Sequence, residues 1–126
     1  QMKLADTDMV LLPGGLGGVH SILASETAMN FIRLAYEKNY LIAAICAAPT
    51  ILASLHITDG RRATCYPGLE DQMDAAKMIP CGAVQDGNVI TGRAAGSADE
   101  FGLACLRALK GEDTARQVAS DIVYRV

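Results

Sequence analysis

The fold of this chain is organised around the segment Leu41-Ile42-Ala43-Ala44-Ile45-Cys46-Ala47-Ala48-Pro49-Thr50. Five apolar residues run without interruption into a cysteine, two alanines and a proline. A continuous apolar run of this kind predicts a parallel β-strand that is covered on both faces. Proline is tolerated in the first turn of a helix, so Pro49 predicts a helix that begins soon after the strand. We therefore expect a strand, a tight turn at Cys46 and a helix.

Cys46 is the candidate nucleophile. Ala44 and Ala48 lie two residues on either side of it, and a nucleophile elbow needs small residues at this spacing because larger side chains would block the turn. The turn would place the sulfur at the carboxyl edge of the sheet and at a helix N-terminus, whose partial positive charge favours the thiolate. The alternative is an inert buried cysteine, the commoner fate of an isolated Cys residue. The surrounding pattern favours reactivity.

Length and composition restrict the class of protein. With 126 residues, of which 51% are hydrophobic, we expect a single domain over residues 1–126. The net charge of −3, without a basic stripe or a membrane-length apolar run, argues against nucleic acid and membrane partners. The 4 cysteines form no C-x-x-C pair and there are only 2 histidines, so we expect no metal site, no disulfide framework and a cytoplasmic, reducing location.

A second apolar strand, residues 8–12, leads into the glycine-rich turn Pro13-Gly14-Gly15-Leu16-Gly17-Gly18. Such a turn brings backbone N–H groups close to a ligand, although a plain loop between strand and helix is the alternative. The turn matches neither the phosphate loop nor the G-x-G-x-x-G fingerprint. A helical pattern then runs to about Asn39, with Ser25 as an internal N-cap. The resulting βαβ crossover places the turn and Cys46 at one edge of the sheet, where open α/β folds bind ligands.

After Cys46, the sequence predicts a series of short strands and helices. His56 lies at the far end of the helix after Cys46, so we interpret it as structural or solvated, and Arg61-Arg62 as a solvated turn with an anion contact as the alternative. Cys105 lies on the apolar face of its helix and is expected in the core. The pattern predicts strands at 63–66, a hairpin at 83–91 around Asp86-Gly87, and helices at 69–78, 97–110 and 113–120.

Two of these motifs in order, Leu12-Pro13-Gly14-Gly15 and Ala44-Ile45-Cys46-Ala47-Ala48-Pro49, resemble the ThiJ/PfpI family in its DJ-one-like branch. Residues 63–67, 86–91, 92–93 and 101–104 extend the similarity over nearly the whole chain. The resemblance implies a flavodoxin-like three-layer α/β sandwich with a mostly parallel sheet, usually a homodimer and without a cofactor. The family fold also has an N-terminal strand and helix with no counterpart here. We expect that a missing N-terminal segment, or a second chain, completes the sheet.

The resemblance also assigns candidate site residues. Cys46 is similar to the family's nucleophile, and Gly15 and Ala47 to the residues whose backbone N–H groups face it. Tyr66 stands beside the cysteine where a family member has histidine, and its phenol is a weaker base near neutral pH. For substrate binding, the resemblance points to Gly14 and Arg93. The glutamate that partners the cysteine belongs to the N-terminal region, so no residue of this chain can be assigned its role.

The implied activity is cysteine-dependent chemistry on small reactive carbonyls, as in a glutathione-independent glyoxalase or deglycase. A non-enzymatic oxidation sensor or holdase chaperone that uses the same cysteine is the alternative. A thiamine-pathway role has no support from a kinase or pyrophosphate motif. A cysteine peptidase is disfavoured because Ala47 stands where the protease-like branch has histidine.

Overall fold

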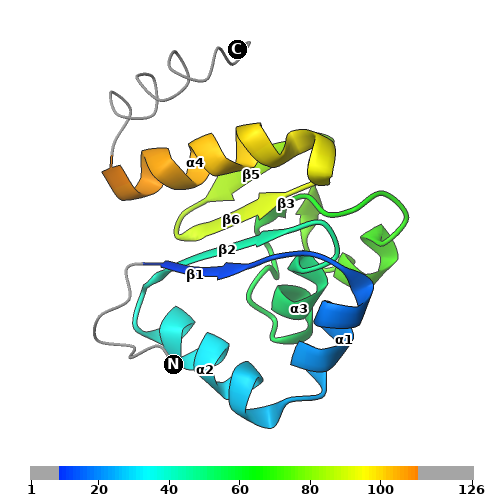
Figure 1. Ribbon diagram of the computed structural model, residues 1–126, viewed down its shortest axis with the longest axis vertical. Helices are drawn as coiled ribbons and strands as arrows, with labels where there is room; N and C mark the ends of the chain where they lie inside the picture. Colours follow the sequence, from blue (N-terminus) through cyan, green and yellow to red (C-terminus); the bar gives the residue numbers. More distant parts are fainter. Residues whose placement is uncertain (1–8, 111–126) are drawn as a thin grey trace.

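The computed structural model describes residues 9–110. Strands and helices follow one another along the whole of this range (Figure 1). In chain order they are β1 (Met9–Leu12), α1 (Leu16–Leu23), α2 (Glu26–Glu37), β2 (Leu41–Ile45), α3 (Pro49–Ser54), β3 (Arg62–Ala63), the 3-10 helix η2 (Glu70–Met73), β4 (Lys77–Met78), β5 (Ala83–Asp86), β6 (Val89–Gly92), the 3-10 helix η3 (Ala95–Ser97) and α4 (Ala98–Lys110).

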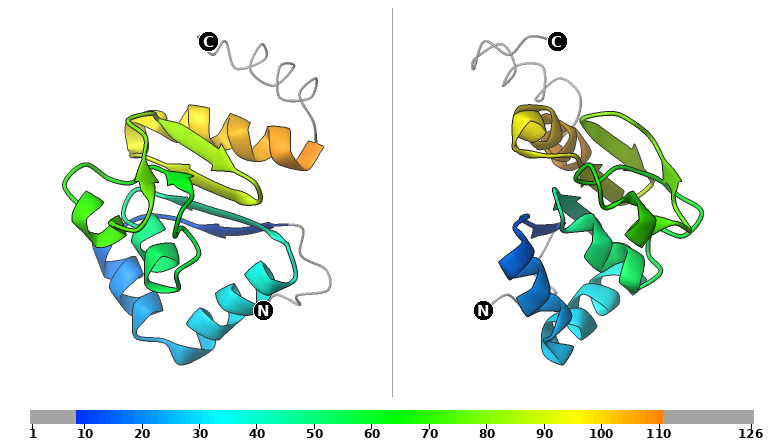
Figure 2. Two further views of the ribbon diagram at one scale, coloured as in Figure 1. Left: turned by 180° about the vertical axis from the view of Figure 1, so that it is seen from behind. Right: turned by 90° about the vertical axis from the view of Figure 1, so that its right-hand side faces the viewer.

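The main sheet has the strand order β1-β2-β6-β5. The pairs β1·β2 and β2·β6 are parallel, and the hairpin strand β5 runs antiparallel to β6. Helices α1, α2 and α3 lie on one face of this sheet and α4 lies on the other (Figures 1 and 2). This arrangement confirms the predicted three-layer α/β sandwich with a mostly parallel sheet.

Strand β2 is buried on both faces, as its apolar run predicted. Ile42 and Ala44 belong to the core cluster between the sheet and the helices α2 and α3. Ala43 points the other way and packs with Phe101 and Ala104 of α4. Side chains alternate between the faces of a strand, so an apolar residue at every position is what a middle layer requires.

The helical pattern between the first two strands forms two helices, separated at Ala24. Ser25 caps α2, since its hydroxyl oxygen accepts a hydrogen bond of 3.1 Å from the N–H of Ala28. The φ of Asn39 is 63°, a left-handed conformation that asparagine adopts more readily than most residues after a helix. The predicted cap at Ser25 is therefore confirmed, and the predicted end of the helix near Asn39 is correct within two residues.

Two predictions between residues 63 and 78 are wrong. The predicted helix over 69–78 is only the 3-10 helix η2, because the following residues form β4: the N–H of Lys77 donates to the carbonyl of Arg61 at 2.7 Å. This two-residue strand pairs in parallel with β3 in a separate two-stranded sheet. The predicted strand over 63–66 is confined to β3, since the N–H of Thr64 already donates to the side chain of Thr91 at 2.9 Å.

The hairpin around Asp86-Gly87 and the burial of Cys105 are confirmed, with Gly87 at a φ of 63°. His56 is solvated, with 81% of its side chain exposed and its Nδ1 3.0 Å from an Asp59 carboxylate oxygen. The interpretation of Arg61 as part of a solvated turn is wrong, because its guanidinium donates three hydrogen bonds. The predicted helix over 113–120 lies outside the described residues.

Candidate active site at Cys46

Cys46 directly follows the last residue of β2 and has a φ of 64°. Positive φ values are uncommon for residues other than glycine and store backbone strain, a feature that clusters at functional sites. Two hydrogen bonds hold this strained peptide. The N–H of Cys46 donates to the carbonyl of Gly92 at 3.1 Å, and the carbonyl of Cys46 accepts the N–H of Tyr66 at 2.8 Å. The strained turn that an elbow requires is therefore present.

The glycine turn after β1 lies against this elbow. A Cβ atom added to Gly14 would lie 2.3 Å from the Cβ of Cys46, so only glycine fits there without a shift. The next residue, Gly15, has a φ of 120°, which side chains rarely permit. The βαβ crossover thus brings the turn and the cysteine to the same edge of the sheet, as the sequence predicted.

The small residues around the cysteine are packed tightly. Ala44 and Ala48 have no solvent exposure, and Ala47 is 5% exposed. The helix α3 begins only at Pro49, so two residues, Ala47 and Ala48, separate Cys46 from the first helical position. Alanine at these positions lets the turn pack into the core without displacing its neighbours.

Cys46 is half-buried and lines a cavity of about 390 Å³. Four of the predicted site residues meet there: Cys46, Gly15, Ala47 and Tyr66. The remaining lining residues, which sequence reasoning missed, are Pro67, Gly68 and Leu69. The Pro-Gly dipeptide is a turn signal that could have pointed to a loop beside the site.

The loop after Tyr66 forms one wall of the cavity and is held in place locally. Gly68 has a φ of 99°, and its N–H donates to a carboxylate oxygen of Glu70 at 2.9 Å. The N–H of Leu69 donates to the carbonyl of Tyr66 at 3.1 Å. Together with the hydrogen bond from the N–H of Tyr66 to the carbonyl of Cys46, these contacts fix the loop relative to the Cys46 turn.

Arg93 is not among the residues that line the Cys46 cavity. It is exposed, and it lines a smaller neighbouring cavity of about 130 Å³ that also contains Cys65 and Glu70. Its backbone N–H donates to the carbonyl of Gly82 at 2.9 Å. Gly14 likewise acts by contact with the elbow and is not a lining residue. The substrate-binding roles of these two residues stay predictions.

A sequence profile of the DJ-1/PfpI family matches residues 1–108. The chain belongs to this family. Among curated relatives, it is 38% identical to Drosophila melanogaster protein DJ-1alpha, covering 94% of this chain and 56% of the fly protein. It is 37% identical to the Parkinson disease protein 7 homolog of Danio rerio, covering 98% of this chain and 67% of the relative. The chain thus spans between about half and two thirds of the length of these relatives.

Solved structures of DJ-1/PfpI proteins share the fold. The crystal structure of Drosophila melanogaster DJ-1beta superposes with a TM-score of 0.90 at 36% sequence identity, covering 98% of this chain and 68% of that one. A structure described as Toxoplasma gondii DJ-1, oxidized, superposes with a TM-score of 0.87 at 26% identity, covering 98% of this chain and 68% of that one. The predicted family and its flavodoxin-like fold are confirmed.

The other thiols of this DJ-1/PfpI chain occupy different environments, and all four cysteines are free. Burial, with smaller contributions from the charges of Glu70 and Asp71, raises the pKa of Cys65 to about 11. Burial alone raises the pKa of Cys105 to about 11. Cys81 is exposed. Of the two cysteines that solvent reaches, Cys46 and Cys81, only Cys46 lines the cavity at the elbow.

Within residues 9–110 of this family member, no three His, Cys, Asp or Glu side chains are grouped in a way that could hold a metal ion. The same part of the chain contains no helix with the length and apolar character needed to cross a membrane.

Proposed function

We propose that the protein uses Cys46 to transform small reactive carbonyl compounds, and that it converts α-oxoaldehydes such as methylglyoxal to hydroxy acids without glutathione. One observation carries the proposal: Cys46 combines a strained backbone, with a φ of 64°, and a place in the wall of a cavity of about 390 Å³. Membership of the DJ-1/PfpI family supports it.

In the first step, the Cys46 thiolate adds to the aldehyde carbon. A carbon–sulfur bond forms, and the electron pair of the C=O bond moves to oxygen, which becomes an alkoxide. Among residues 9–110, the backbone N–H groups of Gly15 and Ala47 donate no hydrogen bond, so both are available to this oxygen. Loss of one such donor typically costs about 10²–10³ in rate.

In the second step, a proton moves from the former aldehyde carbon to the neighbouring carbonyl carbon. The first carbon is oxidised to a thioester and the second is reduced to an alcohol, so no external oxidant is needed. Water then cleaves the thioester, releasing the hydroxy acid and the Cys46 thiol. The proton transfer requires a base. Among residues 9–110, Tyr66 is the only other ionisable side chain that lines the cavity, and a phenol is a weak base at neutral pH.

Tyr66 is therefore proposed to orient the substrate or to donate a hydrogen bond. The resemblance to the family assigns the base to a glutamate, for which the described residues offer no counterpart.

The test is lactate formation from methylglyoxal, without glutathione, by the complete and fully reduced protein and by its Cys46→Ser variant. We expect turnover that the substitution abolishes. Cys81→Ser is the matched control, because Cys81 is exposed and does not line the cavity. Equal activity of the Cys46→Ser variant would reject the assignment of the nucleophile.

The second candidate function is an oxidation sensor connected with oxidative stress. The specific observation in its favour is that one structural relative is described as oxidized. Here the Cys46 thiolate would attack a peroxide oxygen, forming an S–O bond as the O–O bond breaks, and further oxidation would give the sulfinic acid. If the reduced protein forms no hydroxy acid while peroxide oxidises Cys46 selectively, the sensor replaces the enzyme. A holdase chaperone is a further variant of this non-enzymatic role.

We further propose a homodimer in a reducing compartment such as the cytoplasm. The four free thiols are consistent with reducing conditions. The resemblance to the family supports the dimer, and light scattering during gel filtration would measure its mass.

A further inference from the structure

The lining of the Cys46 cavity divides into two parts. Gly15, Cys46 and Ala47 form the part at which the proposed reaction takes place. The other lining residues are the consecutive residues 66–69, which we call the 66–69 wall. When the aldehyde carbon of a substrate is bound at Cys46, the rest of the substrate has this wall to contact.

The 66–69 wall is a type II β-turn. The N–H of Leu69 donates to the carbonyl of Tyr66 at 3.1 Å, and Gly68 has a φ of 99°. This turn type favours proline at its second position and requires a positive φ at its third, and Pro67 and Gly68 meet both conditions. The wall is therefore formed before a ligand arrives, which lowers the entropy cost of binding against it.

Leu69 anchors the wall to the interior of the protein. Its side chain packs against the core cluster that contains Ala47 and also against the smaller cluster around Met73. It is only half-buried, and it lines the cavity together with Pro67 and Tyr66. The cavity thus has an apolar surface whose position is fixed by the core.

No charged side chain of the described residues lines the Cys46 cavity. The two residues that follow the wall, Glu70 and Asp71, are acidic, and their charges add to the burial that raises the pKa of Cys65. Arg93 lines the neighbouring cavity, together with Glu70, and not this one. An anionic group at the wall would lose water without gaining a cationic partner, which is costly. The wall therefore favours an uncharged apolar group.

The cavity is also larger than methylglyoxal requires. Its volume of about 390 Å³ lies within the range of about 300–1,000 Å³ that is typical of pockets for drug-sized ligands. The single methyl group of methylglyoxal would leave much of the 66–69 wall in contact with water. A branched alkyl group would cover more of it, and burial of apolar surface favours binding.

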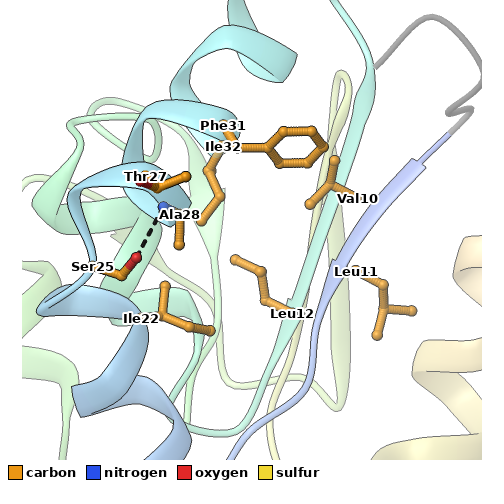
Figure 3. Close-up of a pocket in the computed structure, with 9 residues that line it drawn as sticks. All are labelled: Val10, Leu11, Leu12, Ile22, Ser25, Thr27, Ala28, Phe31 and Ile32. Atoms are coloured by element: carbon orange, nitrogen blue, oxygen red, sulfur yellow. Dashed lines mark hydrogen bonds between the residues drawn. The ribbon is translucent and has the colours of Figure 1, made fainter. Parts of the chain in front are cut away.

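A second cavity, of about 400 Å³, lies between β1 and the helices α1 and α2 (Figure 3). Among residues 9–110, its lining includes no cysteine and no ionisable side chain. It adjoins the edge of β1, where we expect a further segment to complete the sheet. The apolar surface available to a substrate at Cys46 is therefore the 66–69 wall.

We propose that the 66–69 wall binds the substituent of the α-oxoaldehyde and that Leu69 determines its preference for apolar groups, an inference that rests on the proposed reaction at Cys46. The preferred substrates are uncharged α-oxoaldehydes with a branched alkyl substituent, for which isobutylglyoxal is the probe. The bonds formed and broken are those of the reaction proposed for methylglyoxal, so the product is the corresponding hydroxy acid.

Protection of Cys46 from iodoacetamide tests the wall without any turnover. Methyl isobutyl ketone and isovalerate have nearly the same shape, but only isovalerate is charged near neutral pH. We expect isovalerate to need an about tenfold or more higher concentration than the ketone for the same slowing of Cys46 labelling. Labelling of the exposed Cys81 in the same sample is the internal control and should not change.

Turnover by the complete, fully reduced protein tests Leu69. The ratio of kcat/KM for isobutylglyoxal to kcat/KM for glyoxal is compared between variants, so that the intrinsic reactivities of the two aldehydes cancel. Leu69→Asp should lower this ratio about tenfold or more, since one methylene in an apolar pocket is already worth about 10–200-fold. Gln72→Glu is the matched control, because it adds the same charge at an exposed residue of η2 that does not line the cavity. If Leu69→Asp does not fold, as judged by its thermal transition, Pro67→Glu introduces the charge at an exposed lining position.

The results distinguish this inference from the proposed function. If no oxoaldehyde is converted but the ketone still protects Cys46 selectively, the proposed function fails while the wall remains a site for uncharged apolar groups. If turnover depends on Cys46 but the substrate ratio is the same in Leu69→Asp and Gln72→Glu, the role of Leu69 is refuted and the proposed function holds. Equal protection by the ketone and isovalerate would overturn the preference for uncharged groups.

Discussion

Gly14 lies so close to Cys46 that a single methyl group could not be placed between them. An added Cβ would lie 2.3 Å from the Cβ and 3.1 Å from the sulfur of Cys46, and 2.7 Å from the carbonyl oxygen of Ile45. Real Cβ atoms do not approach other atoms this closely, so a substitution must displace either the glycine turn or the elbow. The glycine turn and the Cys46 elbow therefore cannot move independently of each other.

Substitution of Gly14 by alanine tests this coupling. We expect Gly14→Ala to lower the free energy of unfolding by about 1–3 kcal/mol, the usual cost of forcing an extra methyl into a packed site. It should also change the rate at which iodoacetamide labels Cys46. Urea unfolding and mass spectrometry of the labelled protein measure the two effects. Gly17→Ala is the control, because a Cβ there meets nothing within 4 Å. Equal stability and labelling of the two variants would contradict the coupling.

The elbow could be predicted from the sequence because its causes are local. The apolar run of β2, the alanines around Cys46 and the proline at 49 each restrict the backbone within a few residues. The glycine turn was predictable for the same reason. The βαβ crossover then brings the two together by a general rule of chain topology.

The parts that sequence analysis missed depend on contacts between distant segments. The path from Tyr66 to Leu69 is set by the hydrogen bond from Tyr66 to Cys46, twenty positions away. The residues predicted as a helix over 69–78 instead pair partly with β3, where the carbonyl of Arg61 takes the N–H of Lys77. No local pattern encodes such partners, and weak helical periodicity gave the wrong element.

The four thiols should differ in their rates of alkylation. Because the thiolate is the reactive form, the raised pKa values of Cys65 and Cys105, each about 11, should keep both slow near neutral pH. Cys46 should react first, since it lies at the open elbow cavity, and exposed Cys81 second. Limited iodoacetamide labelling near pH 6, repeated in steps toward alkaline pH, measures the order. Early labelling of Cys65 in the folded protein would contradict it.

Acid should weaken the contribution of Asp86 to stability. The backbone N–H of Arg62, which donates to the Asp86 carboxylate at 2.8 Å, lowers the pKa of this group below its usual 3.8, and the charges of Arg62, Arg61 and Lys77 act in the same direction. Because the pKa of Asp86 is lower in the folded protein than in the unfolded chain, its carboxylate stabilises the fold at pH values above 3.8, the pKa in the unfolded chain. This stabilisation is lost as the pH falls through the pKa that Asp86 has in the folded protein.

The Asp86→Asn variant keeps an acceptor for Arg62 but removes the charge. Its thermal midpoint should lie below that of the unsubstituted protein near neutral pH, and the gap should narrow once the pH falls below 3.8. Thermal unfolding followed by circular dichroism over a pH series measures the gap. A gap that is constant down to the acid end of the series would show that the carboxylate charge contributes nothing.

Arg61 connects three segments that are distant in sequence. Its Nη2 donates to the hydroxyl of Tyr36 in α2 at 2.7 Å, its Nη1 to the carbonyl of Asp86 in β5 at 3.0 Å, and its Nε to the carbonyl of Ile57 at 3.1 Å. The guanidinium carbon also lies 5.5 Å from the centre of the Tyr36 ring, within the range of a cation–π contact. The hairpin and α2 are thus held together by one planar side chain.

Removal of the Arg61 side chain should destabilise the fold far more than removal of the side chain of its neighbour, Arg62. We expect Arg61→Ala to cost about 2–4 kcal/mol, since partly buried acceptors lose a charged donor. Arg61→Lys should recover only part of this, because an ammonium cannot reach three acceptors in the fork geometry of a guanidinium. Arg62→Ala is the matched control. The Arg62 side chain is 58% exposed, its Nε lies 3.8 Å from the Asp86 carboxylate, and its Nη2 donates one exposed hydrogen bond to the carbonyl of Gln85 at 3.1 Å. We therefore expect it to contribute about 0–1 kcal/mol.

Chemical denaturation of the three variants measures these differences, and the slopes of the transitions show whether each still unfolds in one step. Tyr36→Phe removes only the hydroxyl and should account for about 1 kcal/mol of the Arg61→Ala loss. In a double-mutant cycle, the combined Arg61→Ala and Tyr36→Phe variant should be less destabilised than the sum of the two single changes, because they share one interaction. Additive effects would mean that the hydrogen bond between these two side chains contributes no stability.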